Sequence, residues 1–484
     1  MIEEERAEEA VMPYREVLAR EQGFLLPPTL EDYLPDDHPA RFVAEFAASL
    51  DLAGLGLLVE AAAAGRPRYR PEHLLCCWLY GFMTKTRSSR LLERACTENV
   101  ALMWLTGGER PDHNTLWRYY RAHRKAMRAL FRQTVRLAVD MGLVDFALQA
   151  VDGTRIAASG AGRRTLSRAE LAALLERVEA SIAALEAQHR AEAGSENPTW
   201  RLSSDLRNQT RLRDRVREGL ARLDAEPTWS TVNLTDLDAR RMQTAHDRLT
   251  GYNAQAVADG SQAILVAMDV TTDGSDAHQL LPMLEEAEAI GGRRAAEVVA
   301  DAGYSSGANL EAMQSAGLSF YAPLQPPSNA TQKPAYYASR FRYDRERDRY
   351  VCPEGQAIVY VYSSQRGGRE RRVYRGQACA GCPARPDCTT NPRGRTIERM
   401  PWAEAVEEHR QRMATDVAKE RMRRRRTLIE PAFGTLKERL GLRQFLLRSL
   451  DGVRAEWLLA GSAYNLLKLY RHWWRPLHPR PAPA

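Results

Sequence analysis

The chain has 484 residues, a length that predicts about three domains. Its composition, 44% hydrophobic and 27% charged, is that of a protein with a folded core, and no run of 18 or more apolar residues predicts a membrane span. The first ten residues, MIEEERAEEA, are acidic and polar, which is wrong for a secretory signal peptide and predicts a cytoplasmic protein.

The net charge is +7 and the isoelectric point is near 9.0, which is compatible with a polyanionic partner but does not require one. Six of the 69 basic residues are Lys, which leaves 63 Arg. A genome rich in G and C accounts for most of this bias. Arg nevertheless binds phosphate as a bidentate fork, so the surface suits a nucleic-acid backbone.

Residues 26–143 predict a helical domain that follows a charged lead-in at 1–25. We expect an apolar helix at 70–83, a Ser-capped helix at 88–105 and a long amphipathic helix at 115–142. Short helices joined by Gly and Pro turns resemble a helix-turn-helix bundle, so this domain is expected to bind DNA. SSRLLERACTEN and NTLWRYYRAHRK are both candidates for the helix that reads bases in the major groove.

An α/β core is predicted over residues 144–325. It begins with a short apolar run at 146–153, typical of a buried strand, and is interrupted at 165–225 by a helical hairpin that opens with the capping box Ser167-x-x-Glu170. The further strands are expected at 252–259, 262–271, 297–301 and 318–324, and the helices between them at 280–290 and 305–317. This order is that of the ribonuclease-H-like fold, so we expect an α/β protein with such a core, interrupted by insertions.

The rest of the chain divides into three parts. Residues 326–400 form a basic, Cys-bearing insert of short β segments, and residues 401–474 return to helix and complete the core. Residues 475–484 are expected to be a disordered tail.

Two aspartates are candidates for phosphodiester chemistry. Such chemistry is served by two divalent ions roughly 3.5–4 Å apart, and Mg²⁺ takes one or two carboxylates per ion. Asp152 and Asp301 each stand where a predicted buried strand ends, a position that a sheet fixes well. An Asp-Gly turn at 152 and a helix cap at 301 are the alternative interpretations.

The third candidate is Glu430, the lone acid in a cationic segment. Arg423, Arg426 and Lys437 lie at −7, −4 and +7 from it, near one helical face. Pro431 predicts a kink that weakens this relation beyond Glu430. The alternative is a solvated basic helix with an incidental Glu.

Three segments resemble the catalytic blocks of insertion-sequence DDE transposases: AVDGTRIAAS, VVADAGYSSG and RRTLIEPAFGTLKERLGLRQF. The last is similar to the family signature Tyr-x2-Arg-x3-Glu-x6-Lys, with Arg426, Glu430 and Lys437 in the matching positions and Arg423 in place of the Tyr. Further blocks between residues 25 and 470, among them LPPTLEDYLPDDHPARFV and GYNAQAVAD, follow in the family's order. The IS-eleven-eighty-two-like transposases are the most similar subgroup.

The resemblance implies that Asp152, Asp301 and Glu430 hold two Mg²⁺ or Mn²⁺ ions. Water would then cut the transposon end, and the freed 3′-hydroxyl would attack target DNA. The resemblance also implies that four basic residues contact DNA: Arg423, Arg426, Lys437 and Arg443. The implied partners are double-stranded DNA, as inverted-repeat ends and as target, and a second copy of the chain on DNA; the implied location is the bacterial nucleoid in the cytoplasm.

Asp236, Asp276 and His278 are further polar candidates. Asp276 precedes the helix predicted at 280–290, so we interpret it as a helix cap. Asp236 and His278 are interpreted as structural.

The seven Cys residues of a cytoplasmic chain argue against a disulfide framework. Cys76, Cys77 and Cys96 lie in apolar helical sequence and are expected in the core. The other four, spaced C-x26-C-x2-C-x5-C, suit a tetrahedral structural Zn²⁺, with four reduced thiols as the alternative: Cys352, Cys379, Cys382 and Cys388. The insert is expected to stand off the core, and its basic run at 366–375 could contact DNA phosphates or simply be solvated.

Two other functions fit the same sequence features. One is a non-catalytic DNA-binding regulator derived from a transposase, and the other is a ribonuclease-H-like nuclease that only hydrolyses. The presence of all three acids favours an active enzyme over the regulator, and a strand-transfer assay separates the nuclease.

Overall fold

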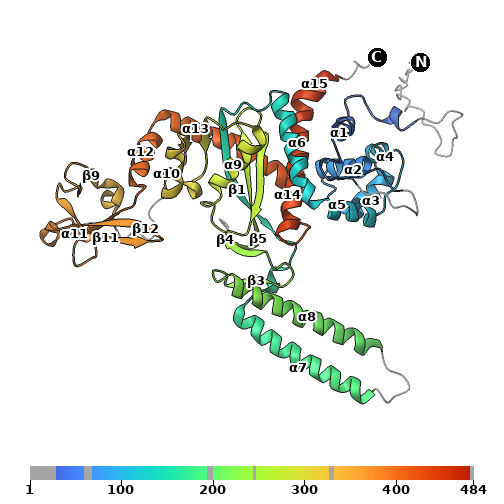
Figure 1. The fold of residues 1–484 in the computed structure, drawn as a ribbon, viewed down its shortest axis with the longest axis horizontal. Helices are drawn as coiled ribbons and strands as arrows, with labels where there is room; N and C mark the ends of the chain where they lie inside the picture. Colours follow the sequence, from blue (N-terminus) through green and yellow to red (C-terminus); the bar gives the residue numbers. More distant parts are fainter. Residues whose placement is uncertain (1–28, 59–67, 193–199, 244–246, 326–331, 480–484) are drawn as a thin grey trace, which may run out of the picture.

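The protein has a mixed α/β fold in three parts that lie side by side (Figure 1). The computed structural model describes residues 29–58, 68–192, 200–243, 247–325 and 332–479. N-terminal helices form one end, a six-stranded sheet with covering helices forms the middle, and a five-stranded sheet forms the other end. In the described part of the chain, no helix has the length and apolar character to cross a bilayer.

The N-terminal part is helical, as expected, but two of the expected helices are broken. Residues 88–105 form two helices because the Asn99 side chain accepts a hydrogen bond from Leu102 N and starts a new helix there. Residues 115–142 are interrupted near His123 by a 3-10 turn. The helices are α1 Pro39–Ala48, α2 Pro71–Met83, α3 Ser89–Glu98, α4 Val100–Leu105, α5 His113–Ala122 and α6 Met127–Asp140.

The central sheet has the strand order β4-β5-β1-β7-β8, with β6 paired to β5 as well. Strand β5 runs antiparallel to β1, β4 and β6, whereas β1, β7 and β8 are mutually parallel neighbours. The strands are β1 Leu148–Ala157, β4 Arg240–Gln243, β5 Arg248–Asp259, β6 Leu265–Thr271, β7 Glu297–Val299 and β8 Ser319–Tyr321. Helices α9 Leu280–Gly291 and α10 Gly307–Ser315 follow β6 and β7.

The prediction that the first core strand ends at Asp152 is wrong. Strand β1 continues to Ala157, and Asp152 lies within it opposite Ala256 of β5. The Asp-Gly pair is therefore no turn, because Gly153 also pairs within the ladder, opposite Gln255.

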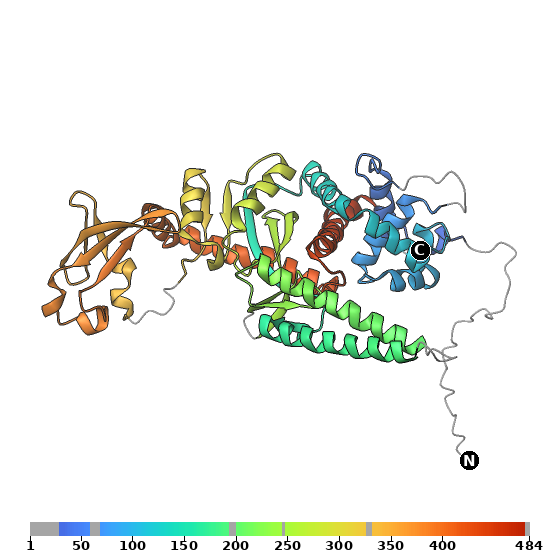
Figure 2. The same ribbon diagram turned by 60° about the horizontal axis from the view of Figure 1, so that its bottom comes forward.

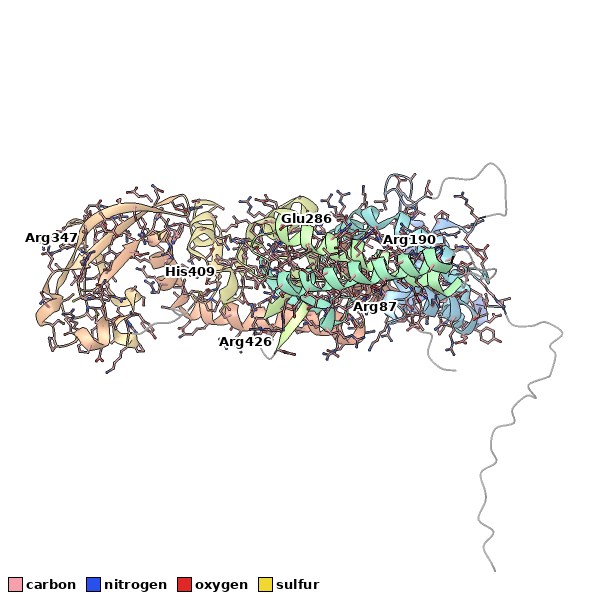
Figure 3. All side chains as sticks on the ribbon, turned by 90° about the horizontal axis from the view of Figure 1, so that it is seen from below. Arg87, Arg190, Glu286, Arg347, His409 and Arg426 are labelled. Carbon is pink, nitrogen blue, oxygen red and sulfur yellow. The ribbon has the colours of Figure 1, made fainter. Side chains whose placement is uncertain are left out.

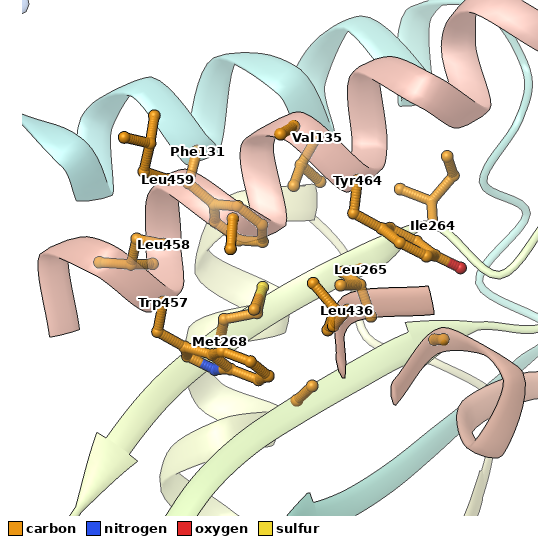
Figure 4. Packing of buried hydrophobic residues seen from close by; sticks show 14 of the residues in the cluster. Phe131, Val135, Ile264, Leu265, Met268, Leu436, Trp457, Leu458, Leu459 and Tyr464 are labelled. Atoms are coloured by element: carbon orange, nitrogen blue, oxygen red, sulfur yellow. The ribbon is translucent and has the colours of Figure 1, made fainter. Parts of the chain in front are cut away.

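Helix α14 (Leu450–Leu469) joins the N-terminal helices to the sheet. Figure 4 shows its Trp457 and Leu459 packed among side chains of α6 and β6, including Phe131 and Met268. A Cβ on Gly461 would lie 2.1 Å from the Met268 sulfur, so a larger residue there would require the Met268 side chain to move.

A buried ion pair fixes the N-terminal part to the same helix. Arg87 donates to Glu456 at 2.8 Å, and these side chains are 9% and 2% exposed. Glu456 also accepts the backbone N–H groups of Leu446 and Leu447. Loss of Glu456 would leave a buried guanidinium unpaired, a change that typically costs about 3–5 kcal/mol.

The helical hairpin is an insertion with a core of its own. Helices α7 (Arg168–Glu192) and α8 (Trp200–Ala225) leave and return through the short strands β2 (Thr165–Ser167) and β3 (Thr231–Asn233). Ser167 and Glu170 form the expected capping box, in which the Glu170 carboxylate accepts Ser167 N at 2.7 Å. Figure 2 shows the hairpin extending from the central sheet. Its tip, expected at 194–200, lies almost wholly outside the described residues.

The Cys-bearing insert folds as an antiparallel sheet in the order β13-β12-β11-β10-β9. It has a separate cluster of buried residues that includes Tyr350, Ile358 and Tyr374. The strands are β9 Arg342–Asp344, β10 Arg349–Val351, β11 Ala357–Arg366, β12 Arg369–Gly376 and β13 Thr396–Arg399, with the short helix α11 Arg385–Cys388 between the last two.

The C-terminal helices return to the central sheet. They are α12 Ala403–Met413, α13 Asp416–Gly434 and α14, and α13 runs on into a π-helical turn at Thr435–Arg439. Pro431, where a kink is predicted, lies inside α13, and the helix continues through it. The expected tail begins with ordered residues, because Arg475–Leu477 form α15 and the His478 ring stacks on Trp474 at 4.1 Å. The expected lead-in at 1–25 lies outside the described residues.

Candidate active site

The parallel pairing of β1 with β7 brings two of the candidate acids together. Ala150 of β1 lies opposite Val299 of β7. Asp152 lies two residues after Ala150, and Asp301 lies two residues after Val299. The two aspartates therefore lie on neighbouring segments in the middle of the sheet. Asp301 follows β7 and caps a 3-10 turn, since its Oδ1 accepts Gly303 N at 2.8 Å.

Helix α13 carries the third acid to this place. Arg425 of α13 donates to Asp152 Oδ2 at 2.8 Å and lies 3.5 Å from Glu430 Oε1. One guanidinium thus connects Asp152 and Glu430, which are separated by more than half of the chain. The Arg425 side chain is 12% exposed, whereas Glu430 is 54% exposed and open to a ligand.

Sequence reasoning missed Arg425. Its neighbours Arg424 and Arg426 belong to the same run of four arginines, so residue type cannot distinguish them. The choice is made by the buried face of α13, where Leu428 and Ile429 pack into the core and turn Arg425 toward the acids.

Asp276 is a fourth acid of the site, and its interpretation as a helix cap is wrong. Helix α9 begins after Gln279 and has no side-chain cap. The Asp276 carboxylate instead accepts hydrogen bonds from Arg155 at 3.1 and 3.2 Å, from Asn253 at 2.7 Å and from Gln255 at 2.9 Å.

Asn253 and Gln255 form a buried polar layer beneath the acids. Both side chains are 0% exposed, and Gln255 also accepts a hydrogen bond from the hydroxyl of Tyr304. Their alternation on β5, within the apolar run YNAQAVAD, places both on the face that meets Asp276. Two amides on one face of a buried strand were the signal that could have identified them.

Two glycines make room for this arrangement. A Cβ on Gly153 would lie 2.3 Å from Gln255 Nε2 and 2.8 Å from Asp276 Oδ1. A Cβ on Gly303 would lie 3.0 Å from Asp301 Oδ1 and 3.5 Å from the Asp276 Cβ. Gly153 therefore permits the close approach of Asp276, while Gly303 leaves room for the Asp301 carboxylate itself.

The crowding of acids changes their protonation. Burial raises the pKa of Asp152 to about 6, and the charges of Asp301 and Asp276 act in the same direction, while Arg425 opposes them. Burial also raises the pKa of Asp301, against the Gly303 N–H and Arg425. The site therefore favours a nearby cation at neutral pH.

The expected DNA contacts differ in their surroundings. Burial lowers the pKa of Lys437, and the nearby charge of Asp152 partly opposes this lowering. Arg426 is exposed on α13 and contacts no carboxylate among the described residues (Figure 3). Arg423 and Arg443 are exposed but pair with neighbouring acids, Glu420 and Glu438.

The two remaining polar candidates lie outside this cluster. Asp236 is 1% exposed and accepts hydrogen bonds from the hydroxyl of Tyr252 and from Ser449 N. His278 is exposed and pairs with Asp273 at 2.8 Å.

The fit of the acids to divalent ions rests on donor type and charge. Within the described residues, no three His, Cys, Asp or Glu side chains are already arranged around one metal position. Asp152, Asp301 and Glu430 nevertheless offer only oxygen ligands, which Mg²⁺ and Mn²⁺ prefer. The Arg425 guanidinium pairs with two of these carboxylates and balances part of their negative charge.

The four clustered cysteines line one cavity of the insert. Backbone N–H groups point at two sulfurs, from Gln356 to Cys352 at 3.3 Å and from Arg395 to Cys379 at 3.4 Å. Burial raises the pKa of Cys388, and the other three thiols act in the same direction. These thiols are therefore neighbours of the kind that a bound cation would stabilise as thiolates.

The other three cysteines are core residues, as predicted. Cys76, Cys77 and Cys96 are at most 3% exposed within the helical part.

Two models of transposase domains match the chain. Residues 28–122 match the transposase domain DUF772, and residues 351–470 match the transposase DDE domain, which includes Glu430 and all four clustered cysteines. These matches agree with the resemblance to DDE transposases that the sequence shows, over the N-terminal helices and the C-terminal third of the chain. A comparison with curated proteins gives no significant match.

Replacing Asp152 with Asn should change how stability depends on pH. The pKa of Asp152 is about 6 in the folded protein and about 4 in the unfolded chain. Ionisation of Asp152 therefore has no effect on stability below about pH 4 and its full destabilising effect above about pH 6. Asn does not ionise. From pH 4 to pH 7.5, the free energy of urea unfolding of the variant should therefore rise relative to that of the wild type, by on the order of 1–3 kcal/mol.

The quantity to measure is how the stability difference between variant and wild type changes with pH. Loss of the Arg425 contact lowers the stability of the variant by the same amount at every pH, so it does not affect this change. The exposed aspartate Asp416, 96% exposed, supplies the control Asp416→Asn, which should track the wild type. An Asp152→Asn curve parallel to that of the wild type would contradict the raised pKa.

Proposed function

We propose that this chain is a transposase that binds the ends of an insertion sequence, cleaves them and joins the 3′-hydroxyl to target DNA. The observation that supports the proposal is that Arg425 of α13 contacts both Asp152 and Glu430, while Asp301 lies near enough to Asp152 to raise its pKa. Burial is the main cause of the raised pKa of Asp152, and the charge of Asp301 adds to it.

The proposed core is ribonuclease-H-like. In support, three antiparallel strands, β6, β5 and β1, are followed by the parallel strands β7 and β8, in that spatial order. The acids stand on the central strand β1, directly after its parallel neighbour β7, and on a helix packed against them.

The acids would hold two Mg²⁺ or Mn²⁺ ions, which when bound supply an activated nucleophile and stabilise the leaving oxygen. Asp152 is buried and positioned by its strand, so it would be the most rigid ligand. Glu430 is half exposed and would act where DNA enters. Asp276, saturated by four donated hydrogen bonds, would hold Arg155 and the amides in place rather than bind an ion itself.

Basic side chains on α13 and the following turn would hold the scissile DNA. Arg426 is exposed and free of carboxylates in the described part of the chain, and Lys437 stands near Asp152, so both suit phosphate. The pairs made by Arg423 and Arg443 are exposed ones, which cost little to exchange for phosphate.

Recognition of the transposon ends is assigned to the N-terminal helices. Helix α3 begins after the Ser88 cap, and α5 begins after the Asp112 cap; both contact each other. One of them would enter the major groove. Binding as a homodimer on DNA is part of this proposal.

The cysteine cluster is proposed to hold a structural Zn²⁺. Cys352, Cys379, Cys382 and Cys388 supply the donor type of such sites, and the two amide-to-sulfur hydrogen bonds would favour thiolates.

Glu430→Gln tests the catalytic assignment. The variant should fold and bind transposon ends as the wild type does, yet cleave them at least about 100-fold more slowly in Mg²⁺, because a neutral amide is a far weaker ligand than a carboxylate. The measurement is the rate of nicking of DNA that carries the inverted repeats flanking the gene.

Glu420→Gln is the matched control. Glu420 lies on the same helix, is equally exposed at 54% and also pairs with an arginine, so its loss should leave cleavage unchanged. Normal cleavage by Glu430→Gln would remove Glu430 from the site. Cleavage without joining by the wild type would favour a nuclease, and binding without cleavage would favour a regulator.

Zinc analysis tests the insert. Purified protein should contain about one zinc per chain, and Cys382→Ser should lose it, since three thiolates bind much less tightly than four. Cys96→Ser, in the helical part, should keep the metal. Zinc-free protein whose four insert thiols all react freely with a thiol reagent would show that the cluster is only a group of reduced cysteines.

A further inference from the structure

The insert carries an unusual share of the positive charge. Residues 332–400 contain 15 Lys or Arg and 7 Asp or Glu, a net of +8 in a chain whose total is +7. Zinc bound by four thiolates would add two negative charges and still leave this small module strongly cationic. A charge of this size on so short a segment indicates a polyanionic partner.

The register of the five-stranded sheet places much of this charge on one face. Residues paired across strands share a face, so Arg349 of β10, Val359 of β11 and Arg375 of β12 form one row. Arg342 of β9 lies in the next row, opposite Val351. The opposite face is covered by the module's own core, which takes the residues that alternate with these, among them: Tyr343, Tyr350, Ile358, Tyr374 and Ile397.

Two of these arginines have no carboxylate to neutralise them. Arg349 pairs with Asp344 at 3.2 Å. Arg342 and Arg375 form no ion pair with any described residue, and the buried Nε of Arg375 has no hydrogen-bond partner there. In the run 366–375, by contrast, Arg366, Arg369, Arg371 and Arg372 all pair with acids.

The two unpaired arginines lie on different strands of the sheet. Arg342 and Arg375 stand three strands apart, roughly 14 Å at about 4.8 Å per strand. That separation is slightly larger than the width of the DNA major groove, about 12 Å. Long arginine side chains can adjust to phosphates on the two sides of the groove.

We propose that this arginine face, formed by Arg342, Arg349 and Arg375, binds the backbone of double-stranded DNA of arbitrary sequence. The two rows hold no Asn or Gln that would read bases, so the contact is to phosphate. The module lies at the end of the molecule away from the N-terminal helices (Figures 1 and 3), with Arg347 labelled there. It therefore suits DNA other than the recognised ends, such as a target. This inference rests on the proposed transposase function.

The test is the salt dependence of binding to a random-sequence duplex without inverted repeats. Each phosphate contact contributes about 0.9 to the slope of log affinity against log salt concentration. The double variant Arg342→Gln/Arg375→Gln should lower that slope by about 2 and weaken binding about 10-fold or more at 0.1 M salt. Arg342→Lys/Arg375→Lys keeps the charges and should retain most of the slope.

The control removes the same charge elsewhere. Arg168→Gln/Arg217→Gln alters two exposed arginines of the helical hairpin and should leave the slope as in the wild type. A Gln variant with the wild-type slope, or a control that loses as much, overturns the proposal. So does a changed oligomeric state with unchanged DNA binding, which would assign the face to a protein contact. Cleavage of pre-bound ends by the Gln variant should persist, so failure here is distinct from failure of the catalytic assignment.

Discussion

The repulsion among buried carboxylates is the constraint around which the centre of this protein is built. Asp152, Asp301 and Asp276 are held close together by strands and glycines, and burial denies them the screening of water. Two arginines enter from different sides: Arg155 binds Asp276, and Arg425 binds Asp152. The position of α13 follows from this, because its buried apolar face and Arg425 must dock on the sheet together.

The chain can be interrupted twice without disturbing this centre because each insertion is self-contained. The hairpin leaves and returns through the paired strands β2 and β3 and packs around its own apolar cluster. The cysteine module has a separate core and hangs between β8 and α12. Meanwhile the segment after α13 is tied back to the end of β1, where Phe445 N donates to Ala157 O. Arg425 thus contacts both Asp152 and Glu430, and Asp301 lies near Asp152, although large insertions separate these acids in sequence.

Much of this arrangement could be predicted from residue patterns. Apolar runs identified most core strands, the capping box identified the start of α7, and the blocks around Asp152, Asp301 and Glu430 indicated the acids. The parallel register of β1 and β7 places Asp152 near Asp301, because each lies two residues after a member of the pair Ala150–Val299. Helix breaks were harder, because Asn99 reads as an ordinary helical residue until its side chain caps the next helix.

What the sequence did not reveal depends on tertiary contacts. Asp276 lies before a helix and has the sequence context of a cap, and only the approach of β5 shows that its partners are Asn253 and Gln255. Arg425 is one of four adjacent arginines, and the docking of α13 alone selects it. Strand β1 passes through an Asp-Gly pair that elsewhere would form a turn, because Gly153 is required by the close contact with β5 rather than by chain reversal.

Manganese soaked into a crystal tests most directly whether these acids share a cation site. Anomalous diffraction from crystals soaked in Mn²⁺ should show metal at about 2.1 Å from carboxylate oxygens of Asp152 and Asp301, with Glu430 as a further ligand. Arg425 would then turn from the acids toward the DNA side. Manganese bound elsewhere on the protein, with Arg425 still between Asp152 and Glu430 at saturating metal, would contradict the account.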